Sequence, residues 1–276
     1  MLVETRLGKL FVEERGEGAP VLLWHSLLCD GGMWRFQVPA LAERHRVITL
    51  DAPGHGRSAP RREPFSLEDC AEAAREVMDA LDVERAHWAG LSWGGMTGMR
   101  FALRHPERLR SLALIDTSAH RESRRKLPSY HVMAFIARRV GAVGPLLDRI
   151  EPLFFTAETR RNRPEVVAEF REHLARMDPA SIGRAVDAVI FHRRDLRERL
   201  GAIRIPTLVL VGAEDVATPP ARAREIAAGI PGASLVEIPG AAHLSALEQP
   251  EAVNAALLGF FEEAELRSSG RTAPDA

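Results

Sequence analysis

The chain has 276 residues, of which 46% are hydrophobic and 27% charged, and its formal net charge is -1. This balance is typical of a soluble protein with one large domain. It excludes the broad positively charged surface with which a protein binds nucleic acid or an anionic membrane. No apolar run is long enough to cross a bilayer, and the first residues lack a signal-peptide pattern, so the cytoplasm is the expected location.

Short apolar runs alternate with helical patterns along most of the chain. Residues 3–7 and 10–14 flank Gly8 and predict an edge hairpin. Further strands are predicted at 21–24, 47–50, 86–91, 112–115, 206–211 and 234–238, and helices at 66–81 (with Ser66 as cap), 94–105, 219–228 and 250–264. The alternation predicts an α/β fold with a mostly parallel, doubly wound sheet.

The alternation stops between residues 118 and 200, where no convincing strand occurs. Amphipathic, arginine-rich helical patterns cover 130–140, 145–154, 164–177 and 181–191. Because this stretch separates two core strands, we predict a helical cap at 118–200, inserted between core segments 1–117 and 201–267. The alternative is a set of peripheral helices. Residues 268–276 are expected to form a flexible polar tail.

The pentapeptide Gly90–Gly94 carries the strongest functional signal. It fits G-x-S-x-G, a strand-to-helix turn that exposes a nucleophilic serine, here Ser92. The preceding residues predict a buried strand, and the following ones predict a helix that Pro106 ends. A chance glycine-serine turn is the alternative, but the strand, the helix and the partners downstream favour a nucleophile.

A serine hydroxyl is a weak nucleophile that needs a base, and the base needs an orienting acid. Asp215 and His243 each follow a predicted strand, so both are expected at the carboxyl edge of the sheet. The alternatives are a helix cap for Asp215 and a surface loop for His243. Glu214 and Asp116 compete for the acid role. Asp215 is preferred, with Asp116 held in second place.

The oxyanion that forms during acyl transfer needs preorganised N–H donors. One is expected from Trp93, which follows the nucleophile at a helix N-terminus. The second is assigned to Leu27, in the loop after strand 21–24. His25 and His55 are interpreted as hydrogen-bonding scaffold, and Cys29 as a packing residue.

Cofactor motifs do not occur in the sequence. There is no HExxH, no paired CxxC, no GxGxxG after a strand and no Walker motif, so neither a metal nor a nucleotide cofactor is expected. Cys29 and Cys70 make no disulfide framework.

Taken together, these motifs resemble the α/β-hydrolase superfamily with a helical cap, and the likeness covers nearly the whole chain. The loop at His25, segment 51–58, the turn at Ser92 and the segments ending in Asp215 and His243 carry it. Ser26 stands where glycine is common. With Leu27, Met33-Trp34 and segment 242–250, it makes the chain similar to 3-oxoadipate enol-lactonases, near metal-independent acyl-homoserine lactonases. The resemblance implies lactone or ester cleavage, and a serine nucleophile argues against haloalkane dehalogenases.

The cap is expected to select the substrate. An enol-lactone with a free carboxylate would need a buried cation, whereas an acyl-lactone would need an apolar tunnel. The cap arginines are interpreted as solvated helix faces and its aromatic residues in part as cap core, which favours an apolar acyl pocket. The predicted pocket residues are Leu28, Phe135, Phe154, Phe191 and Leu244.

The sequence thus predicts a metal-independent serine hydrolase for a small-molecule ester or lactone, as a monomer or homodimer. The alternatives are a general carboxylesterase, a cofactor-free haloperoxidase or perhydrolase, a C–C hydrolase with the same triad, and a non-enzymatic ligand receptor.

Overall fold

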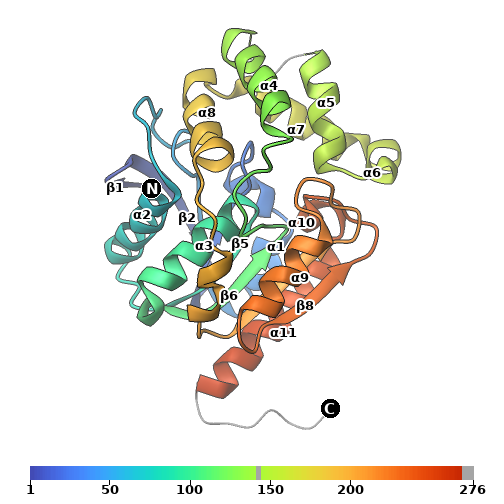
Figure 1. Ribbon diagram of the computed structural model, residues 1–276. Coiled ribbons are helices and arrows are strands. Elements are labelled where there is room, and N and C mark those ends of the chain that lie inside the picture. The colour runs from blue at the N-terminus through green and yellow to red at the C-terminus, as the bar shows by residue number, and fades with distance from the viewer. Residues whose placement is uncertain (141–143, 269–276) are drawn as a thin grey trace.

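In the computed structural model, which describes residues 1–140 and 144–268, the strands form one twisted sheet of order β1-β2-β4-β3-β5-β6-β7-β8 (Figure 1). The strands are β1 Leu2–Thr5, β2 Gly8–Arg15, β3 Ala19–Trp24, β4 His45–Leu50, β5 Ala86–Leu91, β6 Leu109–Ile115, β7 Thr207–Gly212 and β8 Ser234–Ile238. β2 pairs antiparallel with β1 and with β4, and all later neighbours pair parallel. The predicted fold class and the edge hairpin are confirmed.

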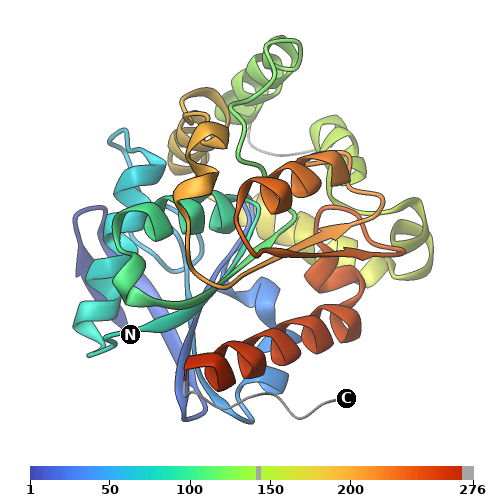
Figure 2. The ribbon, with the colours of Figure 1, turned by 60° about the horizontal axis from the view of Figure 1, so that its bottom comes forward.

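The two faces of the sheet carry separate helical layers. Leu22 and Trp24 of β3 belong to one core cluster, and Val21 and Leu23 belong to the other. One face packs against α2 (Leu67–Ala80), α3 (Trp93–Arg104) and α9 (Pro220–Gly229), and the other against α1 (Gln37–Leu41) and α11 (Pro250–Ser268). Figure 2 shows α3 and α11 on opposite sides of the sheet. Because both faces are buried, central strands such as β5 and β7 appear in the sequence as continuous apolar runs.

The helix boundaries follow local sequence signals. Ser66 precedes α2 and its side chain accepts the Asp69 N–H, while the Asp69 carboxylate accepts the Ser66 N–H. This capping box satisfies two backbone donors that a helix start leaves free. The short elements η1 (Gly31–Trp34), η2 (Pro106–Arg108), η4 (Arg197–Ala202) and α10 (Ser245–Glu248) complete the sheet-and-helix body.

In the part of the chain that the structure describes, five α-helices lie between β6 and β7, and we call them the inserted helices (Figure 1). They are α4 Leu127–Val140, α5 Pro145–Phe154, α6 Ala157–Asn162, α7 Pro164–Arg176 and α8 Pro179–Val186. The helix expected over 181–191 is α8 followed by a π-type turn at Asp187–Phe191, and α6 was not foreseen. No strand occurs in 118–140 or 144–200. The predicted tail, apart from Ser268 at the end of α11, lies outside the described residues.

The chain enters and leaves the inserted helices side by side. The Leu196 N–H donates to the Ala119 carbonyl at 2.8 Å, and Arg193 Nε donates to the His120 carbonyl at 2.7 Å. Ile150 of α5 and Phe170 of α7 belong to the same core cluster as α11. The inserted helices therefore share a hydrophobic core with the sheet.

Glu248 joins the inserted helices to the loop after β8. Its Oε1 accepts the Thr156 N–H at 2.8 Å, and its Oε2 accepts the Ala242 N–H at 2.7 Å. Beside it, the Leu244 N–H donates to the Phe154 carbonyl at 3.2 Å. Burial raises the pKa of Glu248. We call this arrangement the Glu248 clamp, and it fixes the position of α5 and α6 relative to the loop.

Helix α3 lies so close to β5 that Gly98 has no room for a side chain. A Cβ there would be 2.5 Å from Trp88 Nε1, and Trp88 is fully buried. We expect Gly98→Ala to lower the free energy of unfolding by about 1–3 kcal/mol because the helix must move away from the strand. Gly259→Ala, in open space on α11, should raise it by up to about 1 kcal/mol through helix propensity. Urea denaturation of both variants measures this difference, and equal effects would contradict it.

Candidate active site

Ser92 occupies the sharp turn between β5 and α3. Its φ of 53° and ψ of -104° are strained for a residue with a side chain. The turn is held by the Ser92 N–H, which donates to the Ile115 carbonyl at 2.8 Å, and by Thr117 Oγ1, which donates to the Ser92 carbonyl at 2.7 Å. A Cβ at Gly90 would collide with the backbone of Gly94. The glycines of the motif therefore let strand and helix meet at this turn.

Ser92, His243 and Asp215 form one hydrogen-bonded chain. His243 Nε2 lies 2.9 Å from Ser92 Oγ, and His243 Nδ1 lies 2.8 Å from Asp215 Oδ2. Asp215 follows β7 and His243 follows β8, and the three residues are buried. A hydroxyl, an imidazole and a carboxylate thus meet at the carboxyl edge of the sheet, in an order that would let the imidazole take the serine proton while the carboxylate orients it.

The Asp215 carboxylate is held by its own turn. Oδ1 accepts the N–H groups of Ala217 and Thr218 at 2.8 and 2.9 Å, and Oδ2 accepts the Thr218 hydroxyl at 2.7 Å. A short acidic side chain often accepts backbone N–H groups two or three residues on. Thr218 was not foreseen, because its role depends on a rotamer that the sequence does not specify.

Burial and charge act in opposite directions on this pair. Burial disfavours protonated His243, but the charge of Asp215 and its hydrogen bond outweigh burial and raise the pKa of His243. Burial also disfavours ionised Asp215, but the attraction of His243 and the hydrogen bonds from His243 and Thr218 lower its pKa. The pair is therefore arranged as a carboxylate beside a base that readily takes a proton.

Asp116, the competing acid, points elsewhere. Its carboxylate accepts the Gly212 N–H at 2.8 Å and the Ser245 hydroxyl at 2.6 Å. Burial first, and the nearby charge of Asp215 second, raise the pKa of Asp116 to about 8. Asp116 thus links β7 to the loop that carries His243, while Asp215 contacts the imidazole. Glu214 is exposed.

Of the two predicted oxyanion donors, Leu27 lines the same cavity as Ser92, and Trp93 directly follows Ser92 in the chain. The Cys29 N–H donates to the Ser26 carbonyl and closes a turn around Leu27, whose N–H has no backbone acceptor within the described chain. Trp93 is the first residue of α3, where helix geometry leaves the N–H free. Leu28, at φ 67°, completes the turn. Neither N–H group therefore has a backbone hydrogen bond in the described chain that it would have to give up.

His25 supports this loop, whereas His55 Nδ1 donates to the Pro53 carbonyl at 3.0 Å, and in the described chain neither histidine hydrogen-bonds to Ser92. His25 Nδ1 donates to the Ser26 carbonyl at 2.7 Å, and His25 Nε2 accepts the Ala52 N–H at 2.7 Å. Burial lowers the pKa of both histidines, which keeps them neutral. Cys29 is buried, and burial raises the pKa of its thiol, which disfavours the reactive thiolate.

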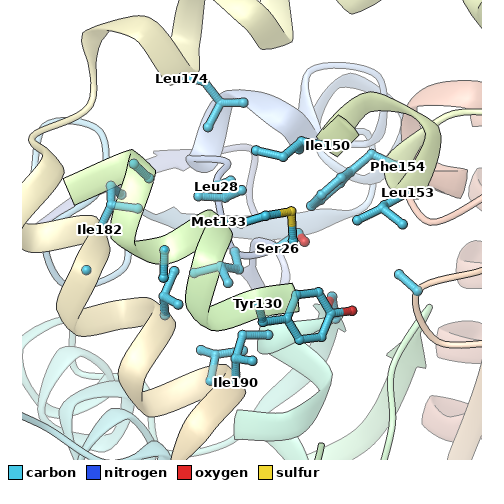
Figure 3. Close-up of a pocket in the computed structure, with 18 of the residues that line it drawn as sticks. Ser26, Leu28, Tyr130, Met133, Ile150, Leu153, Phe154, Leu174, Ile182 and Ile190 are labelled. Carbon is cyan, nitrogen blue, oxygen red and sulfur yellow. The ribbon is translucent and has the colours of Figure 1, made fainter. Parts of the chain in front are cut away.

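A cavity of about 170 Å³ has Ser92 and His243 among its lining residues. Its walls are mostly apolar and come in large part from the inserted helices. They include Met133, Ile150, Leu153, Phe154, Leu174 and Ile182 of these helices, together with Leu28 and Ile190 from outside them (Figure 3). The Phe154 ring also packs edge-on against His243, with ring centroids 5.3 Å apart. Of the predicted pocket residues, Leu28 and Phe154 line the cavity.

The other three predicted pocket residues lie outside it. Phe135 is 60% exposed, and it lines a shallow outer groove with Phe191, which stacks on His131. Met133 of the same helix faces the cavity, and residues two positions apart on a helix point in nearly opposite directions. Leu244 is fully buried in the core below. The pocket assignment is corrected accordingly.

The two arginines that line the cavity are already paired. Arg193 donates to the Val189 carbonyl at 2.6 Å and to Glu122 at 3.0 Å. Arg138 donates to Asp187 at 2.6 Å. The cavity therefore offers a mostly apolar surface, and each of its arginines already has a carboxylate partner from the protein.

Within 1–140 and 144–268, no group of three or more histidine, cysteine, aspartate or glutamate side chains is placed to hold a metal ion. None of the helices in these residues combines the length and apolar character that crossing a membrane requires.

The pKa shifts predict a pH profile. Only neutral imidazole accepts the serine proton, so kcat/KM for a carboxylic ester should rise with pH, with its midpoint above the ordinary histidine value of 6.5. In Asp215→Asn the charge that raises the pKa is gone and burial remains. The midpoint should therefore move to lower pH, while kcat falls by about 10³- to 10⁴-fold. Initial rates over a pH series test this, and an unmoved midpoint in Asp215→Asn would contradict it.

Comparison with known proteins agrees with this geometry. The family model described as alpha/beta hydrolase fold matches residues 19–250. A putative carbamate hydrolase, RutD, of Azorhizobium caulinodans is 35% identical over 260 residues, covering 92% of this chain and 95% of that protein. The enol-lactonase of Burkholderia xenovorans LB400 matches with a TM-score of 0.89 at 32% identity, covering 95% of this chain and 100% of that one. A thermophilic esterase of Thermogutta terrifontis also matches with a TM-score of 0.89 at 32% identity, covering 96% and 98%. The chain belongs to the α/β-hydrolase fold family.

Proposed function

We propose that this protein is a metal-independent serine hydrolase that cleaves a carboxylic ester or lactone through an acyl-enzyme. Ser92 Oγ attacks the carbonyl carbon while His243 Nε2 takes the hydroxyl proton, and Asp215 stabilises the imidazolium. The N–H groups of Leu27 and Trp93 stabilise the oxyanion. His243 then protonates the leaving alkoxide, and a water activated by His243 releases the acid. The chain of hydrogen bonds at 2.9 and 2.8 Å supports these roles.

The substrate class follows from the cavity. Its apolar walls against Ser92 are the observation that carries the proposal of an apolar acyl group, as in an N-acyl lactone or a linear ester. A free carboxylate on the substrate would need a cation, and Arg193 and Arg138 are both committed to protein acceptors. Although a matched structure is named an enol-lactonase, we infer that an enol-lactone bearing a carboxylate is a poor substrate here.

The inserted helices support a cap role. Helices α4, α5, α7 and α8 supply most of the cavity wall. The segments that lead into and out of the inserted helices are joined by the hydrogen bond from the Leu196 N–H to the Ala119 carbonyl. We infer that residues 118–200 act as a cap on a core made of 1–117 and 201–267. Acyl specificity would then reside in the cap and the chemistry in the core.

A substrate panel tests the proposal. Hydrolysis is measured by pH-stat in the presence of a chelator, with N-butanoyl to N-decanoyl homoserine lactones, linear esters of the same acyl groups, a lactone bearing a carboxylate and a simple carbamate. We expect kcat/KM to rise by up to about 4-fold for each methylene that enters the apolar cavity, until the cavity is full. Preference for the carboxylate lactone or the carbamate would contradict the assignment.

Three variants make the panel specific. Ser92→Ala should lower turnover by at least about 10³-fold with an unchanged circular dichroism spectrum. Ile150→Phe adds volume inside the cavity and should shorten the preferred acyl chain. Phe135→Ala, on the outer side of α4, is the matched control and should leave chain preference unchanged. Full activity in Ser92→Ala would rule out the serine mechanism.

A further inference from the structure

Ser26 is a buried polar residue that the mechanism above leaves unused. It is fully buried, and no group in the described part of the chain hydrogen-bonds to its Oγ. Several other buried polar atoms lack a partner, but among the described residues Ser26 is the one of this set that also lines the cavity with Ser92. In Figure 3 it lies in the middle of the apolar ring, near Met133 and Leu28. Buried hydroxyl groups nearly always have a hydrogen-bond partner, so the lack of one at Ser26, in the wall of the cavity, needs an explanation.

The backbone of Ser26 is fixed on every side. Its N–H donates to Met33 Sδ at 3.3 Å, and its carbonyl accepts from His25 Nδ1 at 2.7 Å and from the Cys29 N–H at 3.2 Å. The Cβ position is therefore set by the loop, and rotation about χ1 is the freedom that remains. Because the hydroxyl has no protein partner to give up, it can turn toward a substrate oxygen without breaking a hydrogen bond.

Covalent geometry directs this hydroxyl to the same oxygen that Leu27 serves. Four bonds separate Ser26 Oγ from the Leu27 nitrogen, so the two atoms lie within about 5 Å in any rotamer. Donors at that separation can both reach one oxygen at ordinary hydrogen-bond length. Charge on that oxygen grows in the transition state, so a donor aimed there acts on kcat.

We propose that the Ser26 hydroxyl is a third oxyanion donor, beside the N–H groups of Leu27 and Trp93. This inference rests on the proposed serine hydrolase function. It adds a side-chain donor at a position where glycine is common in the family that this sequence resembles. A glycine at that position has no side-chain hydroxyl to donate. Ser26 is then a catalytic residue that touches the reacting oxygen.

The test separates catalysis from folding. Ser26→Ala should lower kcat for the preferred ester or lactone by about 10- to 10²-fold with KM unchanged, because the lost contact forms only in the transition state. Its thermal midpoint should stay equal or rise, since the buried hydroxyl has no protein partner to lose. Ser26→Thr keeps the hydroxyl and should recover most of kcat.

Ser111 supplies the matched control. It is a fully buried serine on β6 whose Oγ lies 2.8 Å from His87 Nδ1, and it does not line the cavity. Ser111→Ala should lower the thermal midpoint and leave kcat unchanged, the reverse of Ser26→Ala. The proposal is overturned if Ser26→Ala keeps full kcat, raises KM alone, or loses activity only in step with its thermal midpoint. If Ser26→Ala does not fold, Ser26→Gly takes its place with the same expectations.

An alkylboronic acid distinguishes this inference from the proposed function. Boron binds the serine oxygen and becomes tetrahedral, which mimics the oxyanion without requiring turnover. Its inhibition or dissociation constant should rise in Ser26→Ala by the factor that kcat falls. If Ser92→Ala abolishes binding of the boronic acid but Ser26→Ala leaves its dissociation constant unchanged, the proposed role of Ser26 alone is overturned. A parent protein that binds the boronic acid no better than Ser92→Ala would overturn the serine hydrolase assignment, and the role of Ser26 with it.

Discussion

Two contacts that admit no side chain bring the candidate site together. A Cβ on Gly94 would collide with the Trp24 carbonyl, and a Cβ on Gly212 would collide with the Ala242 carbonyl. The first contact sets the end of β3, and so the loop with Leu27, against the turn that carries Ser92. The second sets the end of β7 against the loop that carries His243. Once these backbones touch, the remaining distances follow from short loops and fixed strand register.

Burial gives the site its electrostatic character. Ionised groups out of water are costly unless polar partners surround them, and Asp215 has donors from its own turn as well as from the imidazole. Asp116, which is close enough to feel the charge of Asp215, has its pKa raised to about 8 because burial and that charge both disfavour its ionisation. Two carboxyl groups near one imidazole are thus pushed toward different protonation states, which leaves one of them to orient the base.

The sequence was sufficient for the fold and for the order of the site residues. Apolar runs on strands buried on both faces are long and unambiguous, and residues that follow parallel strands must gather at one edge. The pocket wall was less predictable, because α4 carries apolar side chains on both sides, with Met133 toward the cavity and Phe135 toward solvent. The six residues of α6 are too few to show a helical period. Thr218 could not be predicted because its hydrogen bond to Asp215 is defined only in the folded structure. The same holds for Ser26, whose hydroxyl lacks a partner in the described chain.

The Glu248 clamp bears on how proteins of this architecture diversify. It holds α5 and α6 through the N–H of Thr156, with the hydroxyls of Thr156 and Thr159 beside it, and it holds the loop after β8 through the N–H of Ala242. Two of these contacts are therefore made to main-chain N–H groups. Every residue other than proline carries that group. Side chains on the pocket-facing surfaces of the inserted helices are consequently free to drift under selection without loosening the alignment that His243 depends on. Substitutions that alter the pocket wall can therefore accumulate in the inserted helices while the positions of the residues at the edge of the sheet stay the same.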